Sequence, residues 1–445
     1  YADNGIWENL DPQKIPNILG ALQIGDFSLL FSRSEELTNT RAHLNEIFGQ
    51  RYPERFTPDS LKFYDDKPEE LVLINYTSGS TGFSKGVMLP YRVLLSNVRF
   101  CLDNIPYLNP GDGIVSMLPM AHMYGLTIEI MFPLVVGCHI YFLTRVPSPK
   151  VIMDAFAQVK PKLIITVPLI IEKIIKTKVF PLLEKPLMKL LLHLPFVDDR
   201  LLHRIKEQLT VTFGGQVREV IIGGAALNKE VENFLRRIGF PFTVGYGMTE
   251  CGPLIAYASA ATSRTLSCGR VVDRMKIKVD SPDPFTVPGV LWVKGDNVMH
   301  GYYKNPEATE SAMADGWLNT GDICTIDADN YIYLRGRDKN MILGPSGQNI
   351  YPEEIEQKLN NMPYVNESIV IAEDGDLVAL IYPDFENADE QGIDEKALDQ
   401  LMSENITNLN RELPAYSLVK RFRIYHEEFE KTPKRSIKRY LYQRK

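Results

Sequence analysis

Short hydrophobic runs and longer amphipathic stretches alternate along most of the chain up to about Pro288. The runs at 71–74, 163–167 and 220–222 are rich in Val, Ile and Leu, which is typical of strands that are buried on both faces. Between them lie stretches such as 229–238, whose apolar positions recur with the period of a helix. Because strands that alternate with helices form mainly parallel sheets, this part of the sequence predicts a large domain of α/β subdomains.

The pattern changes after Pro288. The runs at 290–293 and 331–334 are separated by Gly, Asn and Asp turns, which predicts a more antiparallel, distorted barrel-like region. Residues 335–339, Arg-Gly-Arg-Asp-Lys, are polar and contain a glycine, so we expect a connector there.

The last part of the sequence predicts a small, mobile α+β domain. Its predicted helices and strands occupy residues 352–360, 368–372, 377–382 and 393–411. We therefore expect a large domain over 1–336, a hinge over 337–340 and a small domain over 341–445.

Composition narrows the class of protein. A chain of 445 residues suggests two or three domains, and 44% hydrophobic with 24% charged residues excludes a disordered protein. The net charge of −7 argues against a nucleic-acid partner. Five scattered cysteines without a CxxC pair argue against a zinc site or a disulfide framework, and favour a reducing compartment such as the cytosol. No apolar run reaches the roughly 20 residues of a membrane span, and no signal peptide opens the sequence.

The segment 77–86 follows the first predicted strand and is the densest chemical signal. It holds three glycines, five hydroxyl side chains and Lys85. Glycines let backbone N–H groups approach an anion, hydroxyls donate to phosphate oxygens, and the lysine adds positive charge. A Walker A loop would need glycine at Ser84 and Ser or Thr at Gly86, so that motif is excluded. We predict a phosphate-binding loop, with a flexible Ser/Gly loop as the alternative.

This loop closely resembles the signature of the AMP-forming adenylating superfamily, which includes acyl-CoA synthetases, peptide-synthetase adenylation domains and beetle luciferases. Five more segments resemble motifs of that family, in the family's order: 223–227, 245–250, 301–307, 316–322 and 335–339. The resemblance implies activation of a carboxylate by ATP. Attack on the α-phosphate forms an acyl-adenylate and releases pyrophosphate, after which a thiol, usually that of coenzyme A, takes the acyl group.

The resemblance also implies where ATP and Mg²⁺ bind. The residues implied to wrap the β- and γ-phosphates are Thr77, Ser78, Gly79, Ser80, Thr81, Gly82 and Lys85. Thr249 is implied to contact the α-phosphate, and Glu250 to hold Mg²⁺ through a hard oxygen ligand. For Glu250 the alternative is a solvated surface carboxylate.

The nucleoside has its own implied contacts. The residues implied to lie around adenine are Gly223, Gly224, Ala225, Tyr246 and Gly247. Asp322 is implied to accept hydrogen bonds from both ribose hydroxyls, with Arg337 as a second ribose contact. The structural alternatives are a turn role for Asp322 and a core position for Tyr246.

Three further features bear on the acyl group and the thiol. His122 lies in 118–126, which resembles the family segment that borders the acyl pocket; a substrate-side role and a buried core histidine both stay open. Lys339 occupies the implied hinge position, about which the small domain swings. The segment 344–350 resembles the loop that this rotation brings beside the pantetheine channel.

The C-terminal segment departs from the family's pattern. Aligning Thr432 and Arg439 with their family counterparts places Ser436 where the family has a catalytic lysine. Lys434 and Lys438 lie two residues to either side, and Lys434 is the predicted substitute. A basic tail without a catalytic role is the alternative.

Residues 181–209 are apolar with scattered cations and resemble the helical insertion of long-chain fatty acyl-CoA synthetases. They predict contact with a membrane surface, with a packed helical hairpin as the alternative. We therefore expect a cytoplasmic protein, peripheral to the inner face of the membrane. Relatives usually carry about twice the 75 residues that precede Tyr76, and the chain starts at Tyr1, so part of the N-terminal region is expected to be missing.

The leading prediction is a long-chain fatty acid–CoA ligase that uses ATP, Mg²⁺ and coenzyme A. The alternatives are a ligase that loads an acyl-carrier protein, a nucleotide-binding protein without catalysis and, last, a membrane scaffold. The prediction requires Lys85, Glu250 and Asp322 to line one cleft between the two domains.

Overall fold

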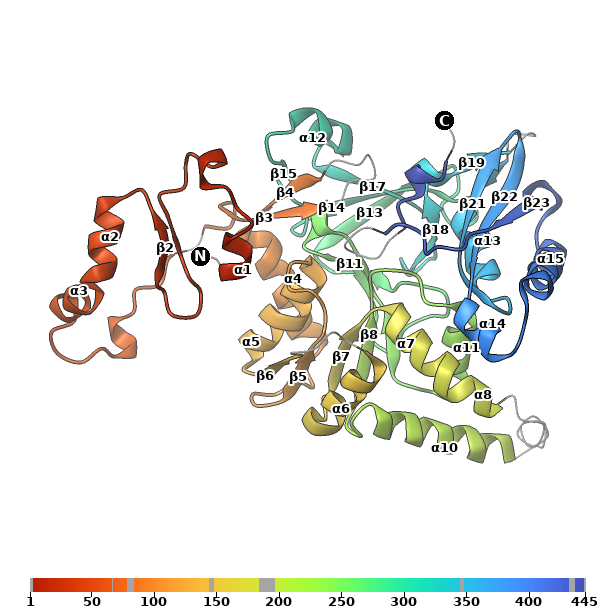
Figure 1. Ribbon diagram of the computed structural model, residues 1–445, viewed down its shortest axis with the longest axis horizontal. Helices are drawn as coiled ribbons and strands as arrows, with labels where there is room; N and C mark the ends of the chain where they lie inside the picture. Colours follow the sequence, from red (N-terminus) through yellow and green to blue (C-terminus); the bar gives the residue numbers. More distant parts are fainter. Residues whose placement is uncertain are drawn as a thin grey trace. The chain divides into compact units, whose positions relative to one another are not determined.

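The computed structural model describes residues 3–65, 67–77, 84–143, 148–183, 197–344, 348–431 and 437–443 (Figure 1). They belong to two compact units, residues 1–66 and residues 67–445, and each is described by itself.

The first unit has little buried surface. Its helices and strands are α1 (Asn4–Trp7), β1 (Gly20–Leu22), β2 (Leu29–Ser32), α2 (Glu35–Ala42) and α3 (Leu44–Arg51). Strands β1 and β2 pair antiparallel, and Ala21 is the one buried apolar residue among those described in this unit. The rings of Trp7 and Phe31 pack at a centroid distance of 5.6 Å.

The second unit opens with an antiparallel hairpin. Strand β3 (Leu71–Thr77) pairs with β4 (Lys85–Pro90), and β15 (Gly301–Tyr302) pairs with the other edge of β4. Helix α4 (Tyr91–Asn104) follows β4 and turns Val93, Leu94 and Val98 into the core. Strand β4 and helix α4 therefore anchor this sheet. The expectation that the run at 71–74 is buried on both faces is wrong, because β3 is an edge strand in which Leu71 and Val72 are exposed.

Two parallel sheets form the predicted α/β part. Strands β7 (Leu163–Thr166), β8 (Glu219–Ile222) and β9 (Phe242–Val244) form one sheet, and β5 (Gly113–Ser116) and β6 (His139–Phe142) form the other. Every residue of β7, β8 and β9 is buried, which explains the hydrophobic runs at 163–165 and 220–222, although Thr166, Glu219 and Thr243 are buried with them. The helical segments of this part are η3 (Tyr124–Met131, a π-helix), α5 (Phe132–Val136), α6 (Pro149–Val159), α7 (Pro168–Ile174), η4 (Ile175–Val179), α8 (Phe180–Leu183), α10 (Val197–Thr212) and α11 (Lys229–Arg237).

Antiparallel strands dominate from β10 (Tyr246–Gly247) to β18 (Ile332–Arg337). Besides β15, the elements between them are η5 (Thr249–Cys251), β11 (Leu254–Tyr257), β12 (Arg270–Val271), β13 (Met275–Asp280), β14 (Gly289–Gly295), α12 (Pro306–Ala312), β16 (Met313–Ala314) and β17 (Trp317–Ile326). Strands β13, β14, β17 and β16 lie in this order, and β18 joins by pairing with β17. The expected antiparallel, barrel-like region is thus confirmed, but it begins before Pro288, because β13 already belongs to its sheet.

The connector predicted at 335–339 is wrong in its first half. Arg335–Arg337 continue strand β18, with Gly336 opposite Ile323 and Arg337 opposite Asp322 of β17. Backbone hydrogen bonds to β17 hold these residues in a strand, which their polar composition did not indicate. Only Asp338–Asn340 form a separate turn, of the 3₁₀ type.

The remaining described residues form a small α+β domain with a core of its own. Its elements are β19 (Ile342–Leu343), β20 (Asn349–Ile350), α13 (Pro352–Leu359), β21 (Val365–Glu373), β22 (Asp376–Pro383), α14 (Phe385–Glu390), α15 (Glu395–Arg411) and β23 (Val419–Ile424). Strand β22 lies between β21, which is antiparallel to it, and β23, which is parallel. Leu359, Met402 and Leu409 are fully buried in the core between this sheet and the helices.

The predicted insertion at 181–209 is described in part, because residues 184–196 lie outside the described residues. Helix α10 packs Leu202 and Leu209 inward and exposes His203 and Arg204. None of the helices in the described ranges combines the length and the apolar character needed to cross a bilayer.

Candidate functional site

The predicted phosphate loop begins and ends at paired strand residues. Thr77, the last residue of β3, lies opposite Lys85, the first residue of β4. The residues predicted to wrap phosphates between these two positions, Ser78, Gly79, Ser80, Thr81 and Gly82, lie outside the described residues. The Lys85 ammonium lies 4.8 Å from the centre of the Tyr302 ring, a cation–π distance.

Tyr302 links Lys85 to the predicted metal ligand. Its hydroxyl donates to Glu250 Oε1 at 2.9 Å, and both side chains are buried. Burial and the charge of Glu250 raise the pKa of Tyr302, so the hydroxyl stays protonated and remains a donor. Glu250 and the buried Thr249 share the 3₁₀ turn that follows β10.

Backbone hydrogen bonds bring the Tyr302 segment to this position. Met299 N donates to Glu250 O at 2.9 Å, and Tyr303 N donates to Gly86 O at 2.7 Å. The segment 299–303 therefore bridges the turn that carries Glu250 and the strand that carries Lys85. The sequence indicated Tyr302 only as a member of the motif 301–307, not as a residue of the site.

The predicted ribose ligand Asp322 is buried in β17 and bonded at both carboxylate oxygens. Its Oδ2 accepts from the Tyr246 hydroxyl at 2.5 Å, and its Oδ1 lies 2.6 Å from Arg337 Nε. Burial raises the pKa of Asp322, and the nearby Glu250 acts in the same direction, whereas Arg337 and Tyr246 oppose the rise. Each oxygen retains a lone pair that can accept a ligand hydroxyl.

Lys85, Glu250 and Asp322 thus belong to one cluster of charges. Glu250 acts electrostatically on Asp322, and Lys85 and Asp322 both act on Lys339. Burial, followed by the charge of Arg337, lowers the pKa of Lys339. The three residues and the predicted hinge lysine are therefore near enough to influence one another electrostatically. That they line one cleft stays a prediction.

Glycines let the predicted adenine segment approach its neighbours closely. A Cβ on Gly223 would lie 3.0 Å from the Tyr124 ring, whose hydroxyl donates to Ile221 O at 3.0 Å. A Cβ on Gly247 would lie 2.1 Å from Pro253 O, so a larger residue cannot occupy this position without moving the backbone. Gly224 and Ala225 are exposed just after β8.

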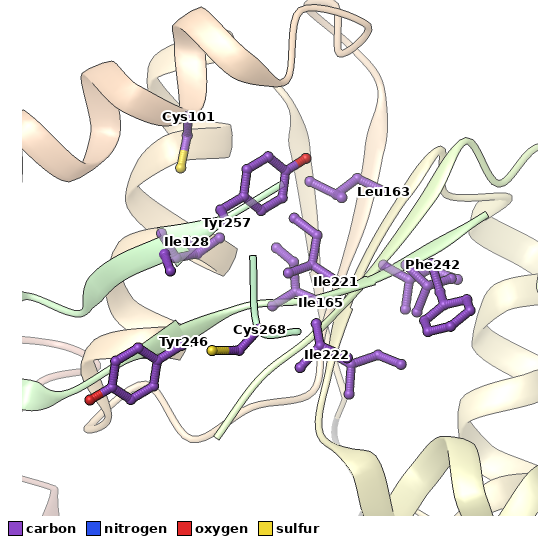
Figure 2. Close-up of a cluster of buried hydrophobic side chains, with 14 of the residues drawn as sticks. Cys101, Ile128, Leu163, Ile165, Ile221, Ile222, Phe242, Tyr246, Tyr257 and Cys268 are labelled. Carbon is purple, nitrogen blue, oxygen red and sulfur yellow. The ribbon is translucent and has the colours of Figure 1, made fainter. Parts of the chain in front are cut away.

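A cavity of about 80 Å³ opens beside these residues. The lining residues are Phe100, Cys101, Ile105, Tyr124, Ile128, Ile221, Gly223, Gly224, Gly245, Tyr246, Gly247, Pro253, Leu254 and Tyr257. Four of the predicted adenine residues are therefore on its wall. Figure 2 shows part of that wall in the core beside β7 and β8, with Ile128 between Tyr246 and Tyr257 and Ile221 beside Ile165.

The other predicted catalytic residues have different positions. His122 is half-buried in the turn before η3, where its N–H donates to Pro119 O at 3.0 Å, and it is not among the lining residues of the cavity. Lys434 and Ser436 lie outside the described residues; their neighbours Lys431 and Ile437 form an isolated β-bridge.

The small domain touches the predicted adenine segment. Gln357 Nε2 in α13 donates to Leu227 O at 3.1 Å, and the side chains of Asn228 and Asn361 are hydrogen-bonded. Asn228 also caps α11, because its side-chain oxygen accepts from the backbone of Glu230 and Val231. The residues at the end of the adenine segment are thus held both by the small domain and by helix α11.

The donor chemistry at Glu250 fits a hard divalent cation. No group of three or more His, Cys, Asp or Glu able to hold a metal occurs among the described residues. Mg²⁺ commonly takes one or two protein carboxylates and completes its shell with substrate phosphates and water. Glu250 can supply such a single carboxylate, with Oε1 already oriented by Tyr302.

Comparisons with known proteins cover most of the chain. The family described as AMP-binding enzyme matches residues 21–303, and its C-terminal domain matches residues 339–445. The chain is 31% identical to 4-coumarate–CoA ligase 1 of Solanum tuberosum, over 68% of this chain and 53% of that protein. It is also 31% identical to the long-chain-fatty-acid–CoA ligase of Escherichia coli, over 67% of this chain and 50% of that protein. The chain thus spans about half the length of the curated relatives that it matches.

Solved structures show the same fold. ATP-bound MatB from Rhodopseudomonas palustris is 25% identical, with a TM-score of 0.67 over 86% of this chain and 69% of that one. The O-succinylbenzoate coenzyme A synthetase of Bacillus subtilis in complex with AMP is 22% identical, with a TM-score of 0.65 over 84% of this chain and 69% of that one.

Proposed function

The chain belongs to the AMP-binding enzyme family, and on this basis we propose that it is an AMP-forming ligase that joins a carboxylic acid to coenzyme A. A carboxylate oxygen of the acid attacks the α-phosphorus of ATP. The bond from this phosphorus to the bridging oxygen breaks, so acyl-AMP forms and pyrophosphate leaves. The thiol of coenzyme A then attacks the acyl carbon, loses its proton, and displaces AMP.

One observation carries the proposal: Lys85, Glu250 and Asp322 share a cluster in which Tyr302 and Tyr246 hold the two carboxylates. In-line displacement at phosphorus needs positive charge near the triphosphate and a fixed position for the sugar. We assign Lys85 and Thr77, with residues 78–82, to the β- and γ-phosphates. Thr249 is assigned to the α-phosphate, and Asp322 with Arg337 to the ribose.

The metal and the adenine complete the nucleotide site. Glu250 would hold Mg²⁺, which would neutralise charge on the phosphates. Adenine lies against the segment that starts at Gly223, Gly224 and Ala225, with Tyr246 and Gly247 on the same side. The role of His122 in acyl binding stays a prediction.

We further propose a hinge at 337–340, with Lys339 as the residue that absorbs the backbone change, between a domain over 1–336 and a small domain over 341–445. Rotation there would expose the acyl carbon to the thiol. The segment 344–350, of which 345–347 lie outside the described residues, stays the loop predicted to lie beside the pantetheine. The contact between Gln357 and Leu227 supports a docked position of the small domain against the nucleotide site. Lys434 remains the proposed substitute for the lysine that is absent at Ser436.

For the acid we propose a fatty acid. The E. coli relative is a long-chain-fatty-acid–CoA ligase, and the segment 181–209 resembles the insertion of such enzymes. This segment stays our proposed membrane contact, and the cytoplasmic face of a membrane our proposed location. Loading of an acyl-carrier protein remains the alternative for the acceptor.

The test is pyrophosphate release from ATP and Mg²⁺ with straight-chain acids from acetate to stearate, followed by thioester formation with coenzyme A or with acyl-carrier protein. We expect acid-dependent release and a coenzyme A thioester. Thioester on carrier protein alone would reject coenzyme A as the acceptor. Retained ATP binding without release for any acid would favour the non-catalytic alternative, which Ser436 motivates.

A further inference from the structure

Tyr257 is on the wall of the cavity beside the adenine segment. This residue is the last of β11, only 7% exposed, and its ring packs edge-to-face on Phe100 at a centroid distance of 5.9 Å. Figure 2 shows the rings of Tyr246 and Tyr257 with their hydroxyls pointing away from each other, and Cys101 on the Tyr257 side. The wall formed by Phe100, Cys101 and Tyr257 therefore lies on a different side of the same space from Tyr246.

A buried carboxylate fixes the Tyr257 ring in this position. The Tyr257 hydroxyl donates to Glu219 Oε2 at 2.6 Å, and the Tyr107 hydroxyl donates to the same oxygen at 2.8 Å. Ala260 N donates to Oε1 of Glu219, which is 2% exposed. Rotating Tyr257 out of the way would deprive a buried carboxylate of one of its donors, which is costly in a site that water does not reach.

The size and chemistry of the cavity restrict what it can hold. Its volume of about 80 Å³ is about half of the roughly 150 Å³ of an apolar cavity that holds a benzene molecule. None of the described residues that line it is acidic, basic or a histidine. Burial raises the pKa of Cys101 to about 12, so its thiol is neutral. A second carboxylate on the acid would find no partner there.

We propose that the acyl group enters this cavity from the Tyr246 side, where Tyr246 also contacts the ribose residue Asp322, while adenine stays outside the cavity. Tyr257, held by Glu219, then sets the depth of the cavity, so that the protein selects short, apolar monocarboxylic acids over long-chain ones. This inference rests on the function proposed above and adds its specificity-determining residue. Each methylene that does not fit a closed apolar pocket changes the relative rate by roughly tenfold or more. The long-chain preference that the sequence predicts is the competing outcome.

The experiment compares kcat/KM for acids of increasing length between the wild type and Tyr257→Ala, with Tyr107→Phe as the matched control. We expect the wild type to favour short acids, with a kcat/KM for palmitate at least tenfold lower than that for its best short acid. We expect Tyr257→Ala to move the optimum to longer acids, because the ring that limits the depth of the cavity is removed. Tyr107→Phe removes a hydrogen bond to the same Glu219 oxygen but is not on the wall, so it lowers the melting temperature and keeps the order of substrates.

A wild type that prefers palmitate, or an unchanged profile in a folded Tyr257→Ala variant, would overturn the inference. Tyr257→Leu, which keeps an apolar side chain but shortens it, serves if the alanine variant does not fold. The shift in melting temperature with each acid is measured in parallel. If no acid gives pyrophosphate but only short acids raise the melting temperature of the wild type, the proposed function is wrong and the limit on cavity depth is supported. If long acids raise the melting temperature, the limit on cavity depth is wrong.

Discussion

Tyr302 and Tyr246 each hold one acidic residue of the site through a single hydroxyl. Tyr302 donates to Glu250 and Tyr246 donates to Asp322. Because both acceptors are buried carboxylates, the loss of a donor leaves charge that water cannot compensate. The site should therefore be sensitive to substitutions that remove one oxygen atom and leave the ring.

Tyr302→Phe tests this expectation. The ring keeps its contact with the Lys85 ammonium, but Glu250 loses the hydrogen bond from the Tyr302 hydroxyl. A hydrogen bond to a charged group contributes about 1.5–3 kcal/mol. We expect kcat/KM for MgATP to fall by about tenfold or more, measured as pyrophosphate release. Tyr303→Phe is the control, because Tyr303 is 41% exposed and no hydrogen bond of its hydroxyl to Glu250 is present. Equal losses in the two variants would contradict the role of Tyr302.

Gly247→Ala tests the close approach of two backbones at the site. A Cβ there would lie 2.1 Å from Pro253 O, and forced overpacking costs about 1–3 kcal/mol or more. We expect a lower melting temperature and weaker ATP binding by calorimetry. Gly49→Ala in α3 is the control, since a Cβ there meets nothing within 4 Å and alanine favours a helix. If Gly247→Ala is as stable as Gly49→Ala, the backbone at Pro253 can shift to accommodate the added methyl group, and the prediction is wrong.

At the scale of elements, the π-helix η3 is tied to the end of β5 by a buried carboxylate. Glu129 of η3 accepts hydrogen bonds from Ser116 Oγ at 2.9 Å and Met117 N at 3.0 Å, and also from Leu118 N. These residues lead into the turn that carries His122. Burial raises the pKa of Glu129 to about 7, although these hydrogen bonds lower it.

This shift predicts a pH dependence of stability. The folded protein holds the Glu129 proton more tightly than the unfolded chain, whose pKa is near 4.5. The stabilisation is complete below that pH and is lost as pH rises to about 7, an effect of about 3 kcal/mol from the size of the shift. Glu129→Gln should therefore flatten the fall in unfolding free energy between about pH 5 and pH 8. Exposed Glu310→Gln on α12 should keep the wild-type slope, and identical slopes in all three proteins would refute the assignment.

The elements could be predicted from the sequence where burial alone determines them. Strands β7 and β8 are buried at every residue, so their hydrophobic runs were sufficient, and the amphipathic pattern located α11 to within a residue of its observed end. Arg335–Arg337 were missed because their strand pairing with β17 depends on a neighbour, not on their own composition.

The site was predictable only as far as its motifs extend. Lys85, Glu250 and Asp322 followed from local resemblance, and the structure brings them together. The link between Tyr302 and Glu250 joins positions 52 residues apart, and that between Tyr107 and Glu219 joins positions 112 residues apart. No local sequence pattern predicts such pairs, because contacts between residues far apart in sequence depend on the tertiary structure.

At the scale of the whole molecule, the small domain has its own hydrophobic core. We expect residues 341–445 produced alone to unfold cooperatively in denaturant, followed by circular dichroism, because Leu359, Met402 and Leu409 are fully buried among residues of this domain. Leu409→Ala should lower its unfolding free energy by about 2–5 kcal/mol. A broad, non-cooperative transition would show that the core needs the rest of the chain.

The register between β17 and β18 has a consequence for how such a domain could move. It places Arg337 opposite Asp322, directly before the turn Asp338–Asn340. On the function proposed above, a pivot at this turn would have its fixed end at the residues assigned to the sugar of the nucleotide. The adenylate would then stay bound while the groups around its acyl end are exchanged, so that one intermediate would serve two successive reactions without being released between them.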